Sequence, residues 1–353
     1  MSIWYPYKQM QSLGKIPTVI KAKGSMLYFE DGTQAIDAIS SWWACIHGYA
    51  YRPLNRTLKK QVDRFSHVML GGLTHTPALK QQPTTNPLIV HIKSIKDLEK
   101  VSENIPYKAY ILAEHFWPGP LTLILPKKPE VSSLITAGND TVAVRVPDHP
   151  MTIELLNKLD FPLVAPSANP YGSISPTSPK HVAGYFDSEL EVILDGGACR
   201  IGIESTIVGF EKEEVIVYRL GSLLLDEIET LVGPVKLKNS TSANPQAPGM
   251  QEKHYAPNKQ SYLTENVDQF LTLNSLSNVG VISFQSEILS PRISQQIVLS
   301  PKGDLKEASR NLYKAMHQLD LSSVDCIVFE SMPKVGLGRT INDKLNRATT
   351  KKQ

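Results

Sequence analysis

One segment sets the architecture of this chain: Pro162-Leu163-Val164-Ala165-Pro166-Ser167-Ala168-Asn169-Pro170-Tyr171-Gly172-Ser173-Ile174-Ser175-Pro176-Thr177. It opens with a short apolar run, which predicts a buried strand, and then turns to hydroxyls, prolines, an amide and a glycine, which cannot continue a sheet. Ser178 and Pro179 follow as an N-cap hydroxyl and a first-turn proline, and they predict a helix over 180–186. Backbone N–H groups at such a turn favour an anion, although an ordinary strand-to-helix connection has the same pattern.

The composition predicts a globular protein with no obligatory macromolecular partner. The chain has 353 residues, 41% of them hydrophobic, which is enough for two domains or three small ones. Lys and Arg number 37 against 34 Asp and Glu, and this near balance demands neither nucleic acid nor an acidic membrane. Cys45, Cys199 and Cys326 lie far apart, so we expect no disulfide framework. No run approaches the ~20 apolar residues of a membrane span, and we expect a cytoplasmic protein without membrane contact.

Residues 1–80 predict a hairpin and a helix. Met26–Phe29 and Ala35–Ile39 flank an Asp31-Gly32 turn, and Leu54–Phe65 has helical spacing. The adjacent Trp42 and Trp43 fit packing better than a pocket.

This front segment resembles the N-terminus of diaminopelargonate (DAPA, adenosylmethionine-8-amino-7-oxononanoate) aminotransferase. The shared motifs are Trp4-Tyr5-Pro6-Tyr7, Ser40-Ser41-Trp42-Trp43, His47-Gly48-Tyr49 and Ser66-His67-Val68-Met69-Leu70-Gly71-Gly72-Leu73-Thr74-His75. The resemblance stops near Lys80. In that family, residues matching Tyr7 and Trp42 line the substrate pocket, but the Schiff-base lysine and the aspartate facing the pyridinium nitrogen have no counterpart in this chain. We therefore expect neither bound pyridoxal phosphate nor aminotransferase activity.

From residue 82 the pattern alternates between strands and helices, which predicts a mixed α/β sheet. The expected strands are Leu88–Ile92, Leu121–Leu125, Thr141–Val146, Val192–Leu194, Ser205–Phe210 and Val215–Tyr218, and the expected helices are Ile95–Val101, Ala109–Phe116 and Met151–Leu159. A polar, proline-bearing linker covers 239–249. Beyond it, Val279–Phe284 and Cys326–Phe329 predict strands, and Leu305–Leu319 and Thr340–Ala348 predict helices.

Polar side chains gather where these strands end. They are Asn86, His91, Thr141, Arg145, Ser167, Asn169, Ser175, Glu204-Ser205-Thr206 and Arg219. Arginines among hydroxyls and amides suit a carboxylate or a phosphate, because guanidinium groups bind such oxygens in pairs. Taken alone, His91 fits a core histidine and either arginine fits a structural ion pair. The motifs of P-loop hydrolases, zinc proteases and common esterases are absent from the sequence.

Many short motifs from residue 86 onward resemble the YrdC-type threonylcarbamoyl-AMP synthases. They are Asn86-Pro87-Leu88-Ile89-Val90-His91-Ile92, Phe116-Trp117-Pro118-Gly119-Pro120-Leu121-Thr122, Val144-Arg145-Val146-Pro147, Ala165-Pro166-Ser167-Ala168-Asn169, Ser175-Pro176-Thr177, Gly202-Ile203-Glu204-Ser205-Thr206-Ile207-Val208 and Arg219-Leu220-Gly221. The two-domain form is indicated by Pro248-Gly249-Met250, His254-Tyr255-Ala256-Pro257, Gly336-Leu337-Gly338 and Ile341-Asn342-Asp343.

The resemblance implies an enzyme that combines L-threonine, bicarbonate or CO2 and ATP into threonylcarbamoyl-adenylate and pyrophosphate, with Mg²⁺ accompanying ATP. The product serves threonylcarbamoyladenosine modification of tRNA, so tRNA and the downstream threonylcarbamoyl transferase are implied partners. Threonine would contact His91, Arg145, Ala165 and Ser205, while ATP would contact Asn86, Thr141, Ser167, Ser175, Arg219 and Tyr255. Lys80 and Asn169 complete the signature. No covalent nucleophile and no protein-bound metal are expected.

The chain departs from this family at its front. The segment of the type Pro-Thr-Glu-Thr-x-Tyr-Gly-Leu and the first strand are missing, and the Lys-x-Arg signature becomes Lys80-Gln81-Gln82. A neutral amide cannot replace a charge-assisted contact worth about 1.5–3 kcal/mol. An impaired synthase is one interpretation, and a remnant or chimera that binds nucleotide or tRNA without synthesis is the alternative.

The expected fold is a YrdC-like twisted mixed sheet with helices, lacking its first strand, and a smaller Rossmann-like C-terminal α/β domain. The expected segments are an aminotransferase-like fragment (1–80), a catalytic domain (81–222), a linker or lid (223–257) and the C-terminal domain (258–353).

Overall fold

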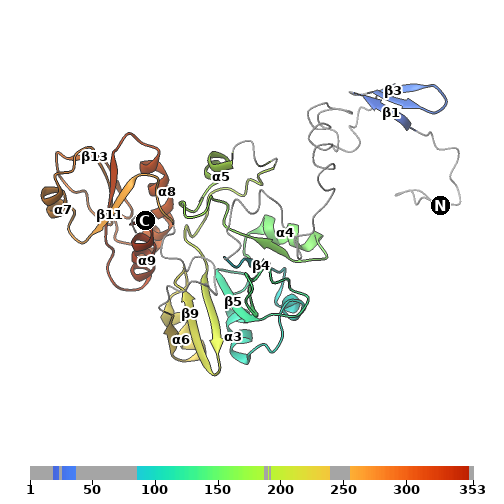
Figure 1. Ribbon diagram of the computed structural model, residues 1–353, viewed down its shortest axis with the longest axis horizontal. Helices are drawn as coiled ribbons and strands as arrows, with labels where there is room; N and C mark the ends of the chain where they lie inside the picture. The colour runs from blue at the N-terminus through green and yellow to red at the C-terminus, as the bar shows by residue number, and fades with distance from the viewer. Residues whose placement is uncertain are drawn as a thin grey trace. The chain divides into compact units, whose positions relative to one another are not determined.

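Runs of β-branched residues and leucine form a seven-stranded mixed sheet. The computed structural model of the chain describes residues 19–23, 26–36, 86–186, 190, 192–238 and 255–349 (Figure 1). From one edge to the other, the strands of this main sheet are β10 (Val235–Leu237), β9 (Glu214–Arg219), β8 (Thr206–Glu211), β5 (Leu121–Pro126), β6 (Thr141–Arg145), β4 (Ile89–His91) and β7 (Leu163–Ala165). β4 runs parallel to β6, β5 to β8 and β9 to β10, while the other neighbours are antiparallel. The predicted mixed α/β sheet is confirmed.

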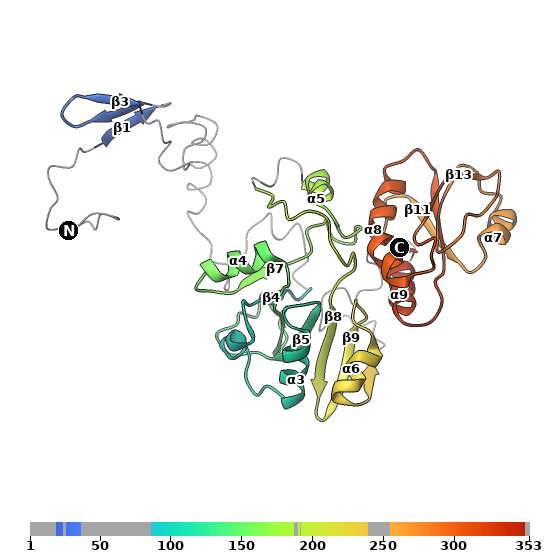
Figure 2. The ribbon, with the colours of Figure 1, turned by 180° about the vertical axis from the view of Figure 1, so that it is seen from behind.

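Helices cover the apolar face of the central strands. The helical elements of this part of the chain are η2 (Ile95–Lys100), α3 (Tyr107–Phe116), α4 (Pro150–Lys158), α5 (Pro179–Phe186) and α6 (Leu225–Val232). Leu112 of α3 and Ile228 of α6 are fully buried in one core with Leu123 of β5 and Val217 of β9. Figure 2 shows both helices against these strands. This packing leaves the strand ends, where the polar groups lie, free of the core.

β7 corrects one expectation. The apolar run at 163–165 predicted a buried strand, but Leu163 and Val164 are half-buried and Ala165 is exposed. Among the strands that the structure describes, β7 pairs with β4 alone and forms the edge of the sheet. One of its sides therefore has no neighbouring strand within the described ranges.

One further prediction for this region was wrong. Residues 192–194 form no strand and pair with no strand among the described residues, and Val192 is 74% exposed. The helix predicted at 95–101 is confirmed as a 3-10 helix over 95–100, with the Val101 N–H donating to the Leu98 carbonyl three residues back.

The front of the chain forms a small sheet of its own. β1 (Val19–Lys23), β2 (Met26–Phe29) and β3 (Gln34–Ile36) are antiparallel, and the predicted hairpin around Asp31-Gly32 is confirmed. Asp31 Oδ1 accepts from the Thr33 N–H at 3.0 Å and fixes the turn. The predicted helix at 54–65, the Trp42-Trp43 pair, Tyr7, Lys80, Gln82 and the linker at 239–249 lie outside the described residues.

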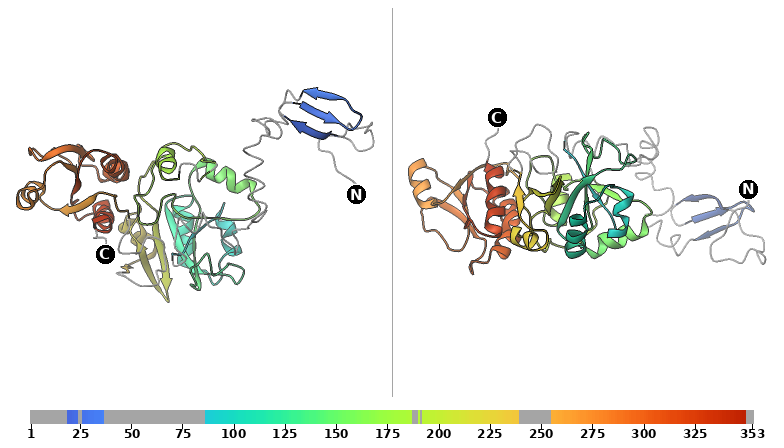
Figure 3. Two further views of the ribbon diagram at one scale, coloured as in Figure 1. Left: turned by 45° about the horizontal axis from the view of Figure 1, so that its top comes forward. Right: turned by 90° about the horizontal axis from the view of Figure 1, so that it is seen from below.

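The C-terminal part is a separate four-stranded parallel sheet with helices. Its elements are β11 (Gln260–Thr264), α7 (Val267–Asn274), β12 (Val279–Ser283), β13 (Ile293–Val298), α8 (Leu305–Asp320), β14 (Cys326–Glu330) and α9 (Leu337–Thr349), with the strand order β11-β14-β12-β13. Figure 3 shows this part of the chain in orange and red. All its pairings are parallel, as a Rossmann-like domain requires. Asp304 begins α8 by accepting a hydrogen bond from the Lys306 N–H at 2.7 Å. Among the described helices, none has the length and apolar content to traverse a bilayer.

Candidate functional site

A cavity of about 900 Å³ opens where the main sheet ends. Four of the predicted ligand residues line it, namely Arg145, Ser167, Ser175 and Ser205. They come from the ends of β6 and β7, from the turn before α5 and from the residue before β8. The topology thus brings together side chains up to 60 residues apart in sequence (145 to 205). The size fits a small-molecule site.

Arg145 supplies one of the positive charges of this cavity. It is the last residue of β6, and its Nε donates to the Gly119 carbonyl oxygen at 2.9 Å, which fixes the guanidinium against the turn before β5. Burial lowers the pKa of Arg145, an effect that Asp148 opposes and Arg219 adds to, but an arginine keeps its charge at neutral pH. A held guanidinium in a partly dry cavity favours a carboxylate or phosphate oxygen.

Ser205 is part of a buried hydroxyl and guanidinium network. Its Oγ lies 2.8 Å from Thr122 Oγ1 and accepts from Arg219 Nη2 at 3.0 Å. Arg219 also donates through Nε and Nη2 to the Ser205 carbonyl oxygen, at 3.1 and 2.9 Å. Arg219 is only 8% exposed and lies behind Ser205 rather than on the cavity wall. The network fixes Ser205 at the cavity.

Glu204 places a carboxylate on the cavity wall. Its Oε1 accepts from Ser175 Oγ at 2.7 Å, and its Oε2 accepts from the Tyr313 hydroxyl of α8 at 3.0 Å. Burial acts to raise the pKa of Glu204, but the charges of Lys344 and Arg219 outweigh it and leave that pKa below its ordinary value. Glu204 is therefore a charged, hydrogen-bonded group that orients Ser175, and it is not a proton donor at neutral pH.

Several predicted ligand residues lie off the cavity wall. His91 pairs in register with Arg145, and its pKa is lowered to about 4 by burial and by the Arg145 charge, so it is neutral. Ala165 pairs with Ile89 at the other end of β4. Thr141 begins β6, four residues and about 13 Å from Arg145. The structure does not bring Thr141 together with the cavity residues.

Asn86 and Asn169 are buried at turns. Asn86 precedes β4 and is 4% exposed. Asn169 is fully buried, and its Nδ2 donates to the carbonyl oxygens of Pro170 and Ser173 at 2.9 and 3.4 Å. Asn169 therefore shapes the turn that carries Ser167 and Ser175.

Tyr255 is fully buried beside the C-terminal helices. Its ring lies 5.5 Å from the Tyr313 ring, and Lys344 Nζ lies 5.2 Å from its centroid. The Ala256 N–H donates to the Gly172 carbonyl oxygen at 2.8 Å, which joins the end of the linker to the turn before Ser175. Burial raises the pKa of Tyr255 far above its ordinary value, so its hydroxyl keeps its proton.

Three groups of residues at this site have no signal in the sequence. Tyr313 lines the cavity from α8, and on sequence it is one more apolar position of an amphipathic helix. Residues 193–201 form a wall of the cavity, and Arg200 within it pairs with Asp148 at 2.5 Å. Lys344 lies in a helix whose spacing predicted only packing. None of these could be found without the fold.

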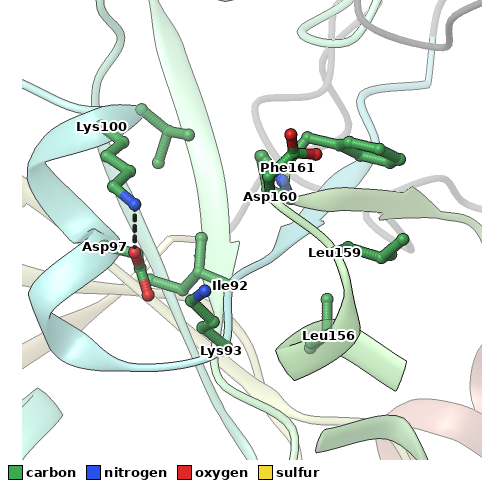
Figure 4. A pocket seen from close by; sticks show the side chains of 10 residues that line it. Ile92, Lys93, Asp97, Lys100, Leu156, Leu159, Asp160 and Phe161 are labelled. Atoms are coloured by element: carbon green, nitrogen blue, oxygen red, sulfur yellow. Dashed lines mark ion pairs between the residues drawn. The ribbon is translucent and has the colours of Figure 1, made fainter. Parts of the chain in front are cut away.

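A second hollow is too small for a ligand. It has a volume of about 30 Å³ and lies between η2 and the end of α4. Figure 4 shows the ion pair between Lys100 Nζ and Asp97 Oδ1, 2.6 Å apart, on the η2 side of this hollow. Space for about one or two waters excludes it as a substrate site.

No cluster of His, Cys, Asp and Glu able to hold a metal ion occurs in the part of the chain that the structure describes. The two carboxylates on the cavity wall already have partners: Glu204 accepts from Ser175 and Tyr313, and Asp148 pairs with Arg200. The residues of this cavity thus do not fit a metal held by the protein.

The front segment matches an aminotransferase family. A family model described as aminotransferase class-III matches residues 10–93. The Buchnera aphidicola (subsp. Acyrthosiphon pisum) adenosylmethionine-8-amino-7-oxononanoate aminotransferase is 51% identical over 77 residues, which are 22% of this chain and 18% of that protein. The chain thus carries less than a fifth of such an enzyme, in agreement with the resemblance seen in the sequence.

The rest of the chain matches a different family. One family model, described as telomere recombination (Sua5, yciO and yrdC), matches residues 77–221, and another, described as threonylcarbamoyl-AMP synthase, C-terminal domain, matches residues 223–350. The threonylcarbamoyl-AMP synthase of Pyrococcus abyssi is 37% identical over 284 residues, covering 76% of this chain and 82% of that protein. The crystal structure of P. abyssi Sua5 complexed with L-threonine superposes with a TM-score of 0.70 at 33% identity, covering 85% of each chain. By sequence over most of its length and by fold, this chain belongs to the threonylcarbamoyl-AMP synthase family.

Proposed function

We propose that the chain is a nucleotidyltransferase that makes threonylcarbamoyl-adenylate and pyrophosphate from L-threonine, bicarbonate or CO2 and ATP. The single observation that carries this is the cavity in which Arg145, Ser167, Ser175 and Ser205 converge. A guanidinium held among hydroxyls, over a carboxylate that is already hydrogen-bonded, suits an amino acid beside a nucleotide. The threonine-bound P. abyssi relative supports the same choice.

Within this proposal Arg145 binds the threonine carboxylate. Its Nε is occupied by Gly119, and no residue of the described chain is hydrogen-bonded to its two terminal nitrogens, which suit the two carboxylate oxygens. The other proposed threonine contacts are Ser205, His91 and Ala165. Ser167 and Ser175 are the proposed ATP contacts on the cavity wall.

The remaining proposed ATP contacts act from behind the wall or from the linker. Arg219 lies behind Ser205, and Tyr255 lies under α8 and α9. For Thr141 and Asn86 the sequence resemblance is the only support. Lys80 and Asn169 are proposed only as members of the family signature.

The chemistry needs alignment more than a covalent nucleophile. Threonine's amine and CO2 form a carbamate and release one proton to solvent. A carbamate oxygen then attacks the α-phosphorus, and the bond from that phosphorus to pyrophosphate breaks. Arg145 holds one reactant and offsets negative charge, while the serine hydroxyls orient the other. Mg²⁺ enters only as the companion of the ATP phosphates, and no step of this scheme runs through it. Pyridoxal phosphate has no part in the proposal.

The product's use and the chain's division into domains complete the proposal. A threonylcarbamoyl group activated as an adenylate suits transfer to tRNA by a partner transferase in the cytoplasm. The proposed division is an aminotransferase-like fragment (1–80), a catalytic domain (81–222), a linker (223–257) and the C-terminal domain (258–353).

The alternative is a remnant or chimera that binds nucleotide or tRNA but makes no adenylate. It is favoured by Gln82, which stands where the family signature has arginine. Pyrophosphate release from ATP, measured with and without L-threonine, separates the two. The synthase predicts threonine-dependent release that Arg145→Met abolishes, with Arg339→Met, on the exposed side of α9, as the control. Binding of an ATP analogue with no threonine-dependent release would establish the remnant.

A further inference from the structure

Lys344 is a lysine buried at the foot of the site. It lies on α9, is 1% exposed, and its Nζ donates to the Leu220 carbonyl oxygen at 2.8 Å. Asp343 Oδ2 lies 3.2 Å from the same nitrogen. Burying an ammonium is costly unless it has partners, and Lys344 directs its shortest contact to a backbone carbonyl next to Arg219.

A second residue of α9 holds the next carbonyl of that turn. Thr340 Oγ1 donates to the Gly221 carbonyl oxygen at 3.1 Å. Residues 340 and 344 are four apart, so they lie on one face of the helix and reach successive carbonyls. The turn is confined from its other side too, because a Cβ on Gly221 would lie 2.3 Å from the Thr206 N. The turn that follows Arg219 thus lies between β8 and α9.

This turn sets the position of Arg219. Its guanidinium makes three hydrogen bonds to Ser205, and Ser205 lines the cavity. A shift of the backbone at 220–221 would move Arg219, and Ser205 with it. Electrostatics connect the same residues, because the positive charges of Lys344 and Arg219 both lower the pKa of Glu204.

We infer that Lys344, with Thr340, is a positioning residue that the C-terminal domain supplies to the site by holding the 220–221 turn behind Arg219 and Ser205. The identity of the ligand rests on the proposed function, but the positioning does not. Lys344 touches no substrate in this arrangement; it acts through Arg219 and Ser205.

The first measurement needs no ligand. Amide hydrogen exchange of residues 205–223 is compared in the full chain, in Lys344→Met and in Lys334→Met, an exposed lysine that pairs with Glu265 within the C-terminal domain. We expect exchange at 219–223 to rise at least tenfold in Lys344→Met and to stay unchanged in Lys334→Met. Thr340→Val, which keeps the side-chain shape, should give a smaller rise and serves where Lys344→Met does not fold. Unchanged exchange in either folded variant would overturn the inference.

The second measurement is calorimetry with a non-hydrolysable ATP analogue and with L-threonine. We expect Lys344→Met to weaken analogue binding about tenfold through Arg219 and threonine binding by a similar factor through Ser205, with Lys344→Arg recovering most of both losses and Lys334→Met changing neither affinity. Unchanged affinities in a folded Lys344→Met chain, or no recovery in Lys344→Arg, would overturn the inference. If the unaltered chain binds neither ligand while the exchange effect is present, the proposed function fails and the positioning stands.

Discussion

The Tyr313 hydroxyl donates to Glu204 Oε2 at 3.0 Å, across 109 residues of sequence. Tyr313 belongs to the C-terminal domain and Glu204 to the segment before β8, so this bond couples the cavity floor to α8. Around it, His317 Nε2 donates to the Ser175 carbonyl oxygen at 3.1 Å. The C-terminal domain therefore contributes residues to the site.

Removing the Tyr313 hydroxyl should destabilise the chain without opening a large cavity. In Tyr313→Phe a buried carboxylate loses one of its two donors, and the expected loss in the free energy of unfolding is about 1–3 kcal/mol. Urea unfolding measures it. Tyr262→Phe, in β11 of the same domain, is the matched control and should change this free energy by less than about 0.5 kcal/mol. Equal effects of the two substitutions would contradict the coupling.

A glycine lies where α8 meets the segment before β8. Gly202 has φ +86, and a Cβ there would lie 2.5 Å from the Arg310 Cα of α8. Gly138 has a similar φ of +82 with nothing within 4 Å. Gly138→Ala should therefore cost about 1 kcal/mol of backbone strain, and Gly202→Ala about 2–3 kcal/mol more, because it also forces two backbones apart. Thermal unfolding measures the loss of stability in both variants. Equal losses would show that α8 moves away from residue 202 without an energetic cost.

Low pH should destabilise the contact between α5 and α8. The rings of His181 and His317 stack 3.8 Å apart, and His181 Nδ1 accepts from the Thr177 N–H at 3.2 Å. Burial, followed by the nearby His317 charge, lowers the pKa of His181 to about 4. Because this folded-state pKa lies below the unfolded value near 6.5, the unfolded chain takes up the proton first as pH falls. The contribution of this histidine to the free energy of unfolding is therefore complete above about pH 6.5 and is lost progressively as the pH falls to about 4.

The protonation of His181 should lower the free energy of unfolding by about 1 kcal/mol. This is well below the value that the full pKa shift would give, because His181 keeps part of its surface in water. Urea unfolding at pH 7.5 and at pH 5 measures it. His181→Phe keeps a stacked ring without the titration, so its pH dependence should be smaller by that amount. His115→Phe, in α3, is the control and should leave the pH dependence as it is.

The local elements were predictable because each depends on neighbours in sequence. The apolar runs of β5, β8 and β12, the Ser178-Pro179 start of α5 and the Asp31-Gly32 turn were all confirmed. β7 was misjudged because an apolar run is the same in a central strand and in an edge strand, and only pairing distinguishes the two.

The site was predictable only in part for the same reason. Arg145, Ser175 and Ser205 stood out as polar groups at strand ends, and the fold brings them to one cavity. Tyr313 and Lys344 reach the site from helices of another domain, and their sequence pattern is that of ordinary core-facing positions. Contacts over more than 100 residues leave no local signature.

Position 82 offers the sharpest test of the nucleotide site. The chain has Lys80-Gln81-Gln82 where the family signature places an arginine at the third position. Gln82→Arg should strengthen binding of a non-hydrolysable ATP analogue about tenfold, because a charge-assisted contact to a phosphate replaces that of a neutral amide. Calorimetry measures the affinity, and Gln81→Arg adds the same charge one residue away as the control. The gain should shrink with added salt and leave threonine affinity unchanged. If both substitutions strengthen binding equally, the effect is only general attraction of an anion, and the phosphate site lies elsewhere.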